Sequence, residues 1–533
     1  MFLNLIKLNF KLIFRSAVFW ICSVIFIFAF GLTVFMYDYL EFVNYSLILS
    51  QSGYIIIILF ILCFISAVYF SHNKTVLEQS CLTPVHIVYK SKFAAVLISF
   101  MTFCIIPVCF FLVLEIIEKN GILFFSLTIL YMVIYLIGII SVATTLGFLT
   151  GYIVRPFYAY IFSIPFAVIF SILFQNTIFK IFGYYKDISF RIYHMITMNS
   201  FFGEGVEVEY RGPNLNILFL IKFLMTMVVA LLLCFILFQV LRGKVRTFSA
   251  VGTVFCVAAY IGLAAAFWKY HPVRYNDLEK LYILDYKQQP YEITSYSGDI
   301  NLKEWSDYSI SVGIKKTGEA DGLTLRLDQS MKIKSLDIDG KDVDYKRFGD
   351  ILEIDCNKEE FTLNLSCGGR ISYVNELHSV NIYTTNTSCA LPPEFAFLPK
   401  IDGDKSKKQY DLSVKSNNTL ISNLDFNKEN GVYKLSGNSQ NMCLFSGFLT
   451  QTEIDGITFY HASCSRKLQK SFEAYYSRMN SNSISVFNPD TYDLEKYSGD
   501  EKSKVFMIYY LYGNNNFFVV YDDYMMYNYG YPI

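Results

Sequence analysis

The first 270 residues of the chain consist of long apolar runs separated by short polar segments. A bilayer core about 30 Å thick requires roughly 20 apolar residues of helix, and seven runs reach that length. We expect membrane-spanning helices at Ser16–Met36, Tyr45–Phe70, Phe93–Leu114, Ile122–Gly147, Pro156–Phe179, Leu215–Leu241 and Phe248–Trp268. Only Arg155 and Pro156 separate the fourth and fifth runs, so this region can contain one span fewer or one span more than predicted. Lys222 lies near one end of the sixth run, where its ammonium is expected to reach the interface.

The short loops between these runs alternate in charge. One set contains ten Lys and Arg residues against the single acid Glu78, whereas the other set is acidic overall. The ten are Lys7, Lys11, Arg15, Lys74, Lys90, Lys92, Arg155, Arg242, Lys244 and Arg246. Because basic short loops stay on the cytoplasmic side, we expect a multi-pass cell-membrane protein with a cytoplasmic N-terminus. Everything after Trp268 is then extracytoplasmic.

The first fifteen residues have basic side chains every fourth position between Leu, Ile and Phe. This spacing predicts an amphipathic helix lying in the inner membrane interface, with an ordinary basic flank as the alternative. The segment does not have the pattern of a cleavable signal.

After about His271 the pattern changes to apolar and polar residues in alternation, with turns such as Asp339-Gly340. Period-two alternation predicts antiparallel strands packed as a sandwich. The clearest candidates are Tyr308–Ile314, Leu323–Leu327, Ile333–Ile338, Ile351–Ile354, Phe361–Leu365, Tyr410–Val414, Gly431–Leu435, Cys443–Gln451 and Gly456–Ser463. Beyond them we expect one helix at Lys467–Met479, three further strands and a Tyr- and Asn-rich tail. The tail tyrosines either form a recognition surface or pack on the sheet.

We therefore expect a polytopic α-helical membrane domain followed by a mainly-β, sandwich-like extracytoplasmic domain. The predicted boundaries are 1–15 for the interfacial helix, 16–268 for the spans, 269–465 for the β domain, and 466–533 for a smaller α/β part with the tail.

Composition agrees with this division, since 54% of the residues are hydrophobic, only 17% are charged, and the mean hydropathy is +0.37. The formal net charge is zero, so global charge gives no reason to expect nucleic-acid binding. Five of the twelve cysteines fall in the polar half, and none of the twelve has CxxC spacing. We expect no metal there, and leave the disulfide status open for Cys356, Cys367, Cys389, Cys443 and Cys464.

The segment from His72 to Lys92 is the longest loop of the cytoplasmic set. Its residues from Thr75 to Val85 are compatible with a short helix that Pro84 closes or kinks; a solvated connector is the alternative. The residues Glu78, Leu82-Thr83-Pro84-Val85 and Lys92 resemble the coupling loop of type-2 ABC transporter permeases. Gln79, Ser80 and Cys81 depart from that pattern. The sequence therefore leaves open which residues of the loop would contact a partner.

This resemblance covers about residues 1 to 245 and implies that the loop docks on a separate ATP-hydrolysing subunit in the cytoplasm. It also implies a second permease copy or a sibling permease. The chain has no GxxxxGK followed by Ser or Thr, so the nucleotide chemistry must come from that partner.

The polar half resembles the N-terminal sandwich of zinc aminopeptidases related to aminopeptidase N. The carrying residues are Tyr291–Tyr296, Ile333–Val343, Glu394–Pro399, Tyr410–Val414 and Gly447–Tyr460. Those peptidases need HExxH for their zinc. The histidines outside the membrane half are His271, His378 and His461, and none has a His four residues away. We therefore expect ordinary core or surface histidines, no catalytic residues, no cofactor, and a peptidase-like domain used for binding.

The resulting hypothesis is a permease subunit of an ATP-binding cassette exporter of unknown substrate, embedded in the lipid bilayer and not itself an enzyme. The alternative is a membrane-anchored extracellular binding or sensor protein without transport activity.

Overall fold

The computed structural model describes residues 2–39, 53–72, 84–118, 122–170, 175–182, 187–196, 216–242, 247–271, 273–274, 289–319, 322–375, 380–393, 395–463, 468–479, 485–487, 494–496, 503–507, 517–521 and 523–528. The chain forms two compact units. One comprises Met1–Gly203 with Pro213–His271, and the other comprises Glu204–Gly212 with Pro272–Ile533. The first unit is helical and the second is mainly β.

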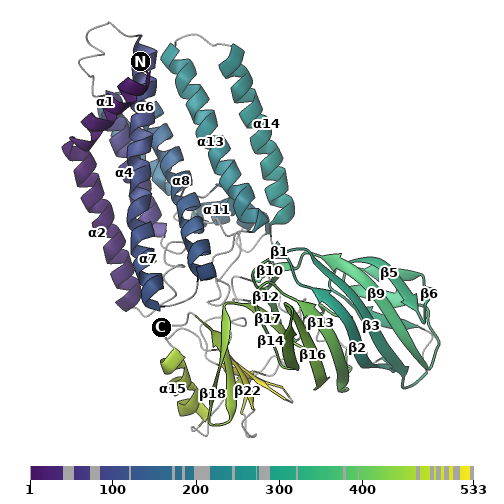
Figure 1. Cartoon of the computed structure of the whole chain (residues 1–533). Coiled ribbons are helices and arrows are strands. Elements are labelled where there is room, and N and C mark those ends of the chain that lie inside the picture. Colours follow the sequence, from purple (N-terminus) through teal and green to yellow (C-terminus); the bar gives the residue numbers. More distant parts are fainter. Residues whose placement is uncertain are drawn as a thin grey trace. The chain divides into compact units, whose positions relative to one another are not determined.

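Long apolar helices lie side by side in the first unit (Figure 1). They are α1 Phe2–Phe14, α2 Ala17–Tyr39, α4 Gly53–His72, α6 Val85–Met101, α7 Ile105–Glu118, α8 Ile122–Ile153, α13 Ile217–Arg242 and α14 Thr247–Tyr270. Within the described residues, four apolar stretches are long enough to cross a membrane: His86–Phe110, Ile122–Ile153, Ile217–Leu241 and Thr247–Tyr270. The pair α1 and α2, bent by 63°, raises this number to at most five. Several helices are thus compatible with a membrane protein, but the seven predicted spans are not all seen.

The predicted fifth span is wrong as a single helix. The described part of that region contains α9 Pro156–Ile161, α10 Ser163–Ile169, α11 Gln175–Phe182 and α12 Asp187–Ile196. Pro165 has no N–H to donate to the carbonyl of Ile161, so the helix cannot continue unbroken past that point. This proline gives a physical reason for the break between α9 and α10.

The predicted start of the third span at Phe93 is also wrong, because α6 begins at Val85. The same stretch then passes through a short 3-10 turn, Thr102–Cys104, before α7. Pro107 lies in the first turn of α7 and cannot donate to the carbonyl of Phe103, which accounts for the irregular turn.

The closest helix contact of this unit joins α4 and α8. A methyl group added at Gly147 would lie 2.5 Å from the Phe64 carbonyl oxygen, and one added at Gly151 would lie 2.1 Å from Ser71 Oγ. Gly147 and Gly151 are four residues apart and therefore share one helix face. Small residues at this spacing let helix backbones approach closely in a membrane, where packing rather than the hydrophobic effect holds helices together.

The second unit contains four described sheets. An eight-stranded sheet has the order β15-β16-β13-β2-β3-β9-β5-β6. Its strands are β2 Tyr291–Asn301, β3 Ser306–Lys316, β5 Lys332–Ile338, β6 Lys341–Asp342, β9 Glu360–Gly369, β13 Lys408–Lys415, β15 Asp425–Glu429 and β16 Val432–Ser439. A three-stranded sheet joins β4 Leu323–Arg326, β8 Ile351–Ile354 and β7 Tyr345–Phe348.

A six-stranded sheet has the order β1-β10-β11-β12-β17-β14. It contains β1 Val273–Arg274, β10 Ser372–Asn375, β11 Val380–Thr384, β12 Cys389–Leu391, β14 Thr419–Ser422 and β17 Leu444–Gly447. The fourth sheet, β18-β19-β22-β24-β23-β20-β21, accompanies α15 Leu468–Met479. Its strands are β18 Leu449–Ile454, β19 Ile457–Ala462, β20 Ser485–Phe487, β21 Leu494–Lys496, β22 Lys504–Met507, β23 Phe517–Val520 and β24 Met525–Asn528.

The prediction of a mainly-β region is confirmed, whereas the prediction of purely antiparallel pairing is wrong. Strand β2 pairs with β13 in parallel, and β19 pairs with β22 in parallel. These partners are far apart in sequence, so a hairpin rule applied to neighbouring strands could not find them. The seven-stranded sheet also joins strands from both sides of residue 465. Tyr524 and Tyr527 are buried in it, which favours packing over a recognition surface for that part of the tail.

Alternation gives the eight-stranded sheet one apolar and one polar face. In β3 the side chains of Tyr308, Ile310, Val312 and Ile314 are buried, while those between them are exposed or half-buried. The buried face therefore contributes to the core of this unit, and the opposite face carries small polar side chains.

Candidate functional site

The predicted coupling residues fall around the start of α6. Glu78, Leu82 and Thr83 lie outside the described residues. Pro84 has φ −56° and ψ 122° and occupies the position immediately before the helix, which begins at Val85. Its carbonyl oxygen accepts hydrogen bonds from Ile87 N at 2.8 Å and Val88 N at 3.4 Å.

Pro84 therefore immediately precedes α6, and the short helix predicted over Thr75–Val85 lies, up to Thr83, outside the described residues. The extended ψ of Pro84 and its missing N–H are both compatible with a helix start and incompatible with a helix interior.

The two lysines predicted at the end of the loop lie inside α6. Lys90 Nζ is 4.5 Å from the ring centroid of Phe238 on α13. Lys92 Nζ is 5.5 Å from the ring centroid of Tyr89, and the Lys92 residue is only 3% exposed. The faces of aromatic rings stabilise nearby cations. Each ammonium group can therefore lie beside a ring within the helical unit. Lys92 thus does not simply mark the solvated end of a loop.

Helix α1 packs against α6 through one narrow face. Leu5, Asn9 and Ile13 are its buried residues, and they recur every fourth position. Asn9 Nδ2 donates a buried hydrogen bond of 3.1 Å to Ser91 Oγ on α6. Neither Asn9 nor Ser91 was found by sequence reasoning. The sequence did contain a sign of this contact, because Asn9 is a polar residue between Leu5 and Ile13 on one face of α1.

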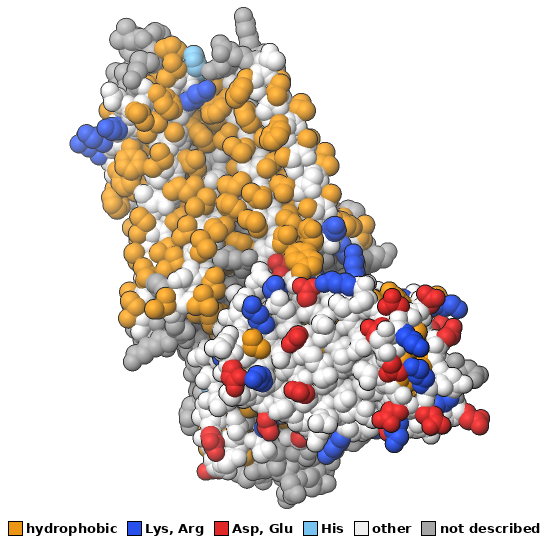
Figure 2. All heavy atoms as spheres, turned by 45° about the vertical axis from the view of Figure 1, so that its right-hand side comes forward, with side chains coloured by type: hydrophobic (Ala, Val, Ile, Leu, Met, Phe, Trp, Pro, Cys, Tyr) orange, Lys and Arg blue, Asp and Glu red, His pale blue; other side chains and the backbone are white. Residues whose placement is uncertain are grey.

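The rest of α1 is exposed and mixed in character. Lys7, Lys11 and Arg15 are exposed, as are the apolar Leu3 and Leu12. Figure 2 shows Lys and Arg side chains near one end of the helical unit, above a flank that is largely hydrophobic. The predicted amphipathic helix is present, and its exposed mixture of basic and apolar side chains suits a membrane interface.

Helices α1, α6 and α13 therefore meet around Asn9, Ser91 and Lys90. We name this set the α1–α6 junction. Its contacts connect the segment after the predicted coupling motif to the interfacial helix on one side and to α13 on the other. The described contacts of the junction are this hydrogen bond and this cation–ring contact, and neither pairs a nucleophile with a base.

The histidines of the polar half divide between the units. His461 is buried, its Nε2 lies 2.9 Å from Thr452 Oγ1, and its Nδ1 lies 2.9 Å from the Ala462 carbonyl oxygen. Burial lowers the pKa of His461 from its usual value of 6.5. The prediction of an ordinary core histidine is confirmed here. His378 lies outside the described residues, and His271 packs beside Phe267 in the helical unit.

Among the described residues, no group of three or more His, Cys, Asp or Glu side chains is placed to hold a metal ion. Cys356, Cys367 and Cys389 are buried free thiols, Cys443 is also buried, and Cys464 lies outside the described residues. Burial raises the pKa of Cys367 to about 12, so this thiol is poorly suited to act as a nucleophile.

Sequence reasoning missed a buried carboxylate of the β unit whose pKa is clearly shifted, Asp328. Asp328 is 2% exposed; its Oδ2 accepts a 2.6 Å hydrogen bond from the Tyr373 hydroxyl, and its Oδ1 accepts one from Ser330 N at 3.0 Å. Burial is the largest cause that raises the pKa of Asp328 from 3.8 to about 6. The neighbouring Arg347 guanidinium donates to backbone carbonyls, including those of Leu327 and Asp328, so it supports the loop around Asp328.

Comparison with known proteins gives little beyond the fold. No protein-family model matches the chain, and no curated protein matches its sequence. Among solved structures, leukotriene A4 hydrolase from Saccharomyces cerevisiae is similar over 45% of this chain and 41% of its own, with 11% identity and a TM-score of 0.28. The M1 zinc metallopeptidase from Deinococcus radiodurans is similar over 33% of this chain and 48% of its own, with 12% identity and a TM-score of 0.26.

The chain therefore spans less than half the length of either of these structures. The similarity to the M1 aminopeptidase fold is weak and partial, and at such TM-scores it carries no argument about activity.

Proposed function

We propose that this chain is the membrane-spanning permease subunit of an ATP-driven exporter and that a separate cytoplasmic subunit hydrolyses the ATP. The observation that carries the proposal is the α1–α6 junction. The sequence motif that resembles a permease coupling loop leads directly into α6, and α6 is hydrogen-bonded to the amphipathic α1.

The junction supports a simple mechanical sequence. Force applied to residues 78–85 by a docked ATPase would move the first turn of α6, because Pro84 is bonded to that turn. Contacts at Ser91 and Lys90 would pass the displacement to α1 and α13. Packed helices transmit such shifts because their interiors are dense and resist local deformation.

Co-purification followed by a coupling assay tests this proposal. The full chain is isolated from its native membrane, and an ATPase subunit is expected to remain bound. Glu78→Lys and Pro84→Ala should then lower substrate-stimulated ATPase activity while leaving membrane insertion intact. Pro290→Ala in the β unit is the matched control and should keep full coupling. Normal coupling in both loop variants would show that the motif does not contact the ATPase.

The second candidate is a membrane-anchored binding or sensor protein without transport. The polar face of the eight-stranded sheet favours it, because a depression of about 370 Å³ there is lined by Asp299, Ser309, Ser413 and Lys415 among others. Absence of any ATPase from the purified complex, together with saturable ligand binding to the β unit, would support this alternative over transport.

The exporter proposal includes a second permease copy or a sibling permease in the same bilayer. The resemblance to type-2 permeases supports this part of the proposal, because one set of spans is too few to enclose a typical pathway of that family. Cross-linking of the purified complex and mass measurement would distinguish one permease chain from two.

A further inference from the structure

Helix α13 contains a buried lysine that the proposed coupling mechanism does not use. Lys222 lies in the second turn of α13 and is 3% exposed. Its Nζ donates to the carbonyl oxygens of His194 and Met195, the second at 2.7 Å, in the last turn of α12. The C-terminal carbonyls of α12 thus hold the ammonium inside the helical unit near the start of α13.

These two carbonyls do not neutralise Lys222. An ammonium has three donors, and a helix C-terminus supplies only about half of a negative charge. No described carboxylate forms an ion pair with Lys222. A lysine buried in an apolar helix is costly to keep charged, and such residues are candidates for functional sites.

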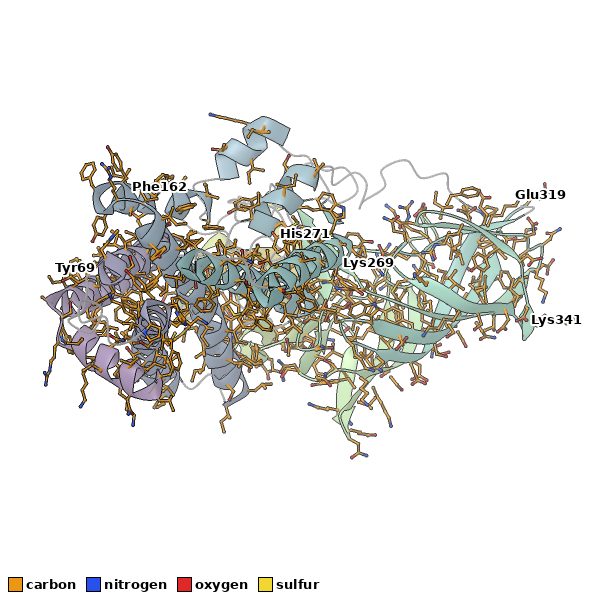
Figure 3. All side chains as sticks on the ribbon, turned by 90° about the horizontal axis from the view of Figure 1, so that it is seen from above. Tyr69, Phe162, Lys269, His271, Glu319 and Lys341 are labelled. Atoms are coloured by element: carbon orange, nitrogen blue, oxygen red, sulfur yellow. The ribbon has the colours of Figure 1, made fainter. Side chains whose placement is uncertain are left out.

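Two more cations lie around the same helix ends. The Arg191 guanidinium carbon of α12 is 5.3 Å from the Trp268 ring, and Arg191 Nη1 donates to the Trp268 carbonyl oxygen of α14. Lys269 is exposed, and its Nζ is 5.6 Å from the Tyr270 ring. Figure 3 labels Lys269 and His271 at this end of α14.

Lys222 belongs to the same cluster through Phe267. Its Nζ is 5.7 Å from the Phe267 ring, and Phe267 directly precedes Trp268 and Lys269. We name Arg191, Lys222 and Lys269 the outer basic cluster. Asp187, four residues before Arg191 on α12, is the one acid in the sequences of these three helices, and Arg242 lies at the opposite end of α13.

The surroundings indicate where the ligand comes from. Leu220, Leu224 and Ile261 on α13 and α14 are exposed apolar residues, as a lipid-facing surface requires. Trp268 and Tyr270 lie in the last turn of α14, and Trp and Tyr concentrate at the level of lipid headgroups. A negative group at that depth belongs to a lipid more readily than to a soluble molecule, since the phosphate of a phospholipid is located there.

We infer that the outer basic cluster binds the phosphate of an anionic phospholipid headgroup. Lys269 supplies the accessible ammonium and Arg191 supplies a planar guanidinium suited to phosphate, with Lys222 buried behind them. The inference requires that α13 and α14 cross a membrane, and it is independent of whether the chain transports anything.

Native mass spectrometry of the full chain tests the inference. The protein is purified in neutral detergent and titrated with phosphatidylglycerol, with phosphatidylcholine, or with inorganic phosphate. Wild type should retain phosphatidylglycerol preferentially. Lys269→Gln should weaken retention about fivefold, and Arg191→Gln with Lys269→Gln about 25-fold, because each basic side chain near a membrane surface contributes a comparable factor. Lys315→Gln, an exposed lysine of the β unit, is the control.

Lys269 is exposed and has no hydrogen bond or ion pair with another described residue, so its substitution should not impair folding, and thermal unfolding checks this for both variants. Equal retention by wild type and the double variant would overturn the inference. Equal retention of phosphatidylglycerol and phosphatidylcholine would do the same. Displacement of the lipid by millimolar inorganic phosphate would assign the cluster to free phosphate and refute the lipid source.

Discussion

Asp328 predicts an unusual pH dependence for the β unit. Its carboxyl is buried, and its pKa is raised from 3.8 to about 6, chiefly by burial. A carboxyl that holds its proton more tightly in the folded state stabilises that state at low pH. This contribution is complete below the unfolded pKa of 3.8 and is lost as the pH rises through 6.

The size of the effect follows from the two pKa values. At about 1.4 kcal/mol for each pH unit between them, the full contribution is about 3 kcal/mol, of which about 2 kcal/mol falls between pH 4.5 and 7.5. Asp350 and Asp523 also have pKa values raised by burial, so they contribute in the same direction. The effect of Asp328 is therefore isolated as a difference between wild type and Asp328→Asn, whose amide does not titrate.

Pulsed thiol labelling measures this difference in the full chain. Cys367 on β9 is a fully buried free thiol and becomes reactive only when the β unit opens. The pulse uses a dipyridyl disulfide, which also reacts with thiols in acid, because alkylating reagents need the thiolate. Urea titrations at pH 4.5 and 7.5, read out by mass spectrometry of the Cys367 peptide, then give the free energy of opening at each pH. Asp328→Asn should lose about 2 kcal/mol of the pH dependence. The exposed Asp355→Asn is the control and should keep it. The same pH dependence in wild type and Asp328→Asn would refute the reasoning.

Three further predictions concern packing and polar contacts. Gly147→Ala forces the Phe64 backbone of α4 away, because the added methyl group would overlap it. The free energy of unfolding, measured by heating the protein in detergent, should fall by about 1–3 kcal/mol. Gly262→Ala is the control and should leave it unchanged, because its methyl group meets nothing within 4 Å. Asn9→Leu removes the hydrogen bond to Ser91 and should lower the free energy of unfolding by about 1 kcal/mol. Asn4→Leu changes an exposed residue of the same helix and should cause no loss. Equal losses in both variants would show that this hydrogen bond does not hold α1 in place. Arg326→Gln breaks the two hydrogen bonds of 2.9 and 2.7 Å that the guanidinium donates to the Asp402 carboxylate, and should lower the free energy of unfolding in urea by about 3 kcal/mol. Lys334→Gln breaks an exposed ion pair with Asp307 and should lower it by less than about 1 kcal/mol. Similar losses in the two variants would contradict the role of burial.

The apolar runs and the alternating strands could be predicted because both are local. The strand predicted at Ile351–Ile354 is β8, and the predicted helix Lys467–Met479 is α15 Leu468–Met479. The Asp339-Gly340 turn has φ 54° and 79°, as a tight hairpin between β5 and β6 requires. Periodicity and turn chemistry are carried by neighbouring residues, so the chain specifies them without help from distant segments.

Contacts between distant segments were decided only by the tertiary structure. The sequence placed Lys92 at the end of a loop and Lys222 near an interface, but aromatic rings and the last turn of α12 allow both to be buried. Likewise, the parallel pairing of β2 with β13 and the raised pKa of Asp328 depend on segments far apart in the chain. Burial and charge compensation are properties of an environment that many segments build together, and no local pattern records them.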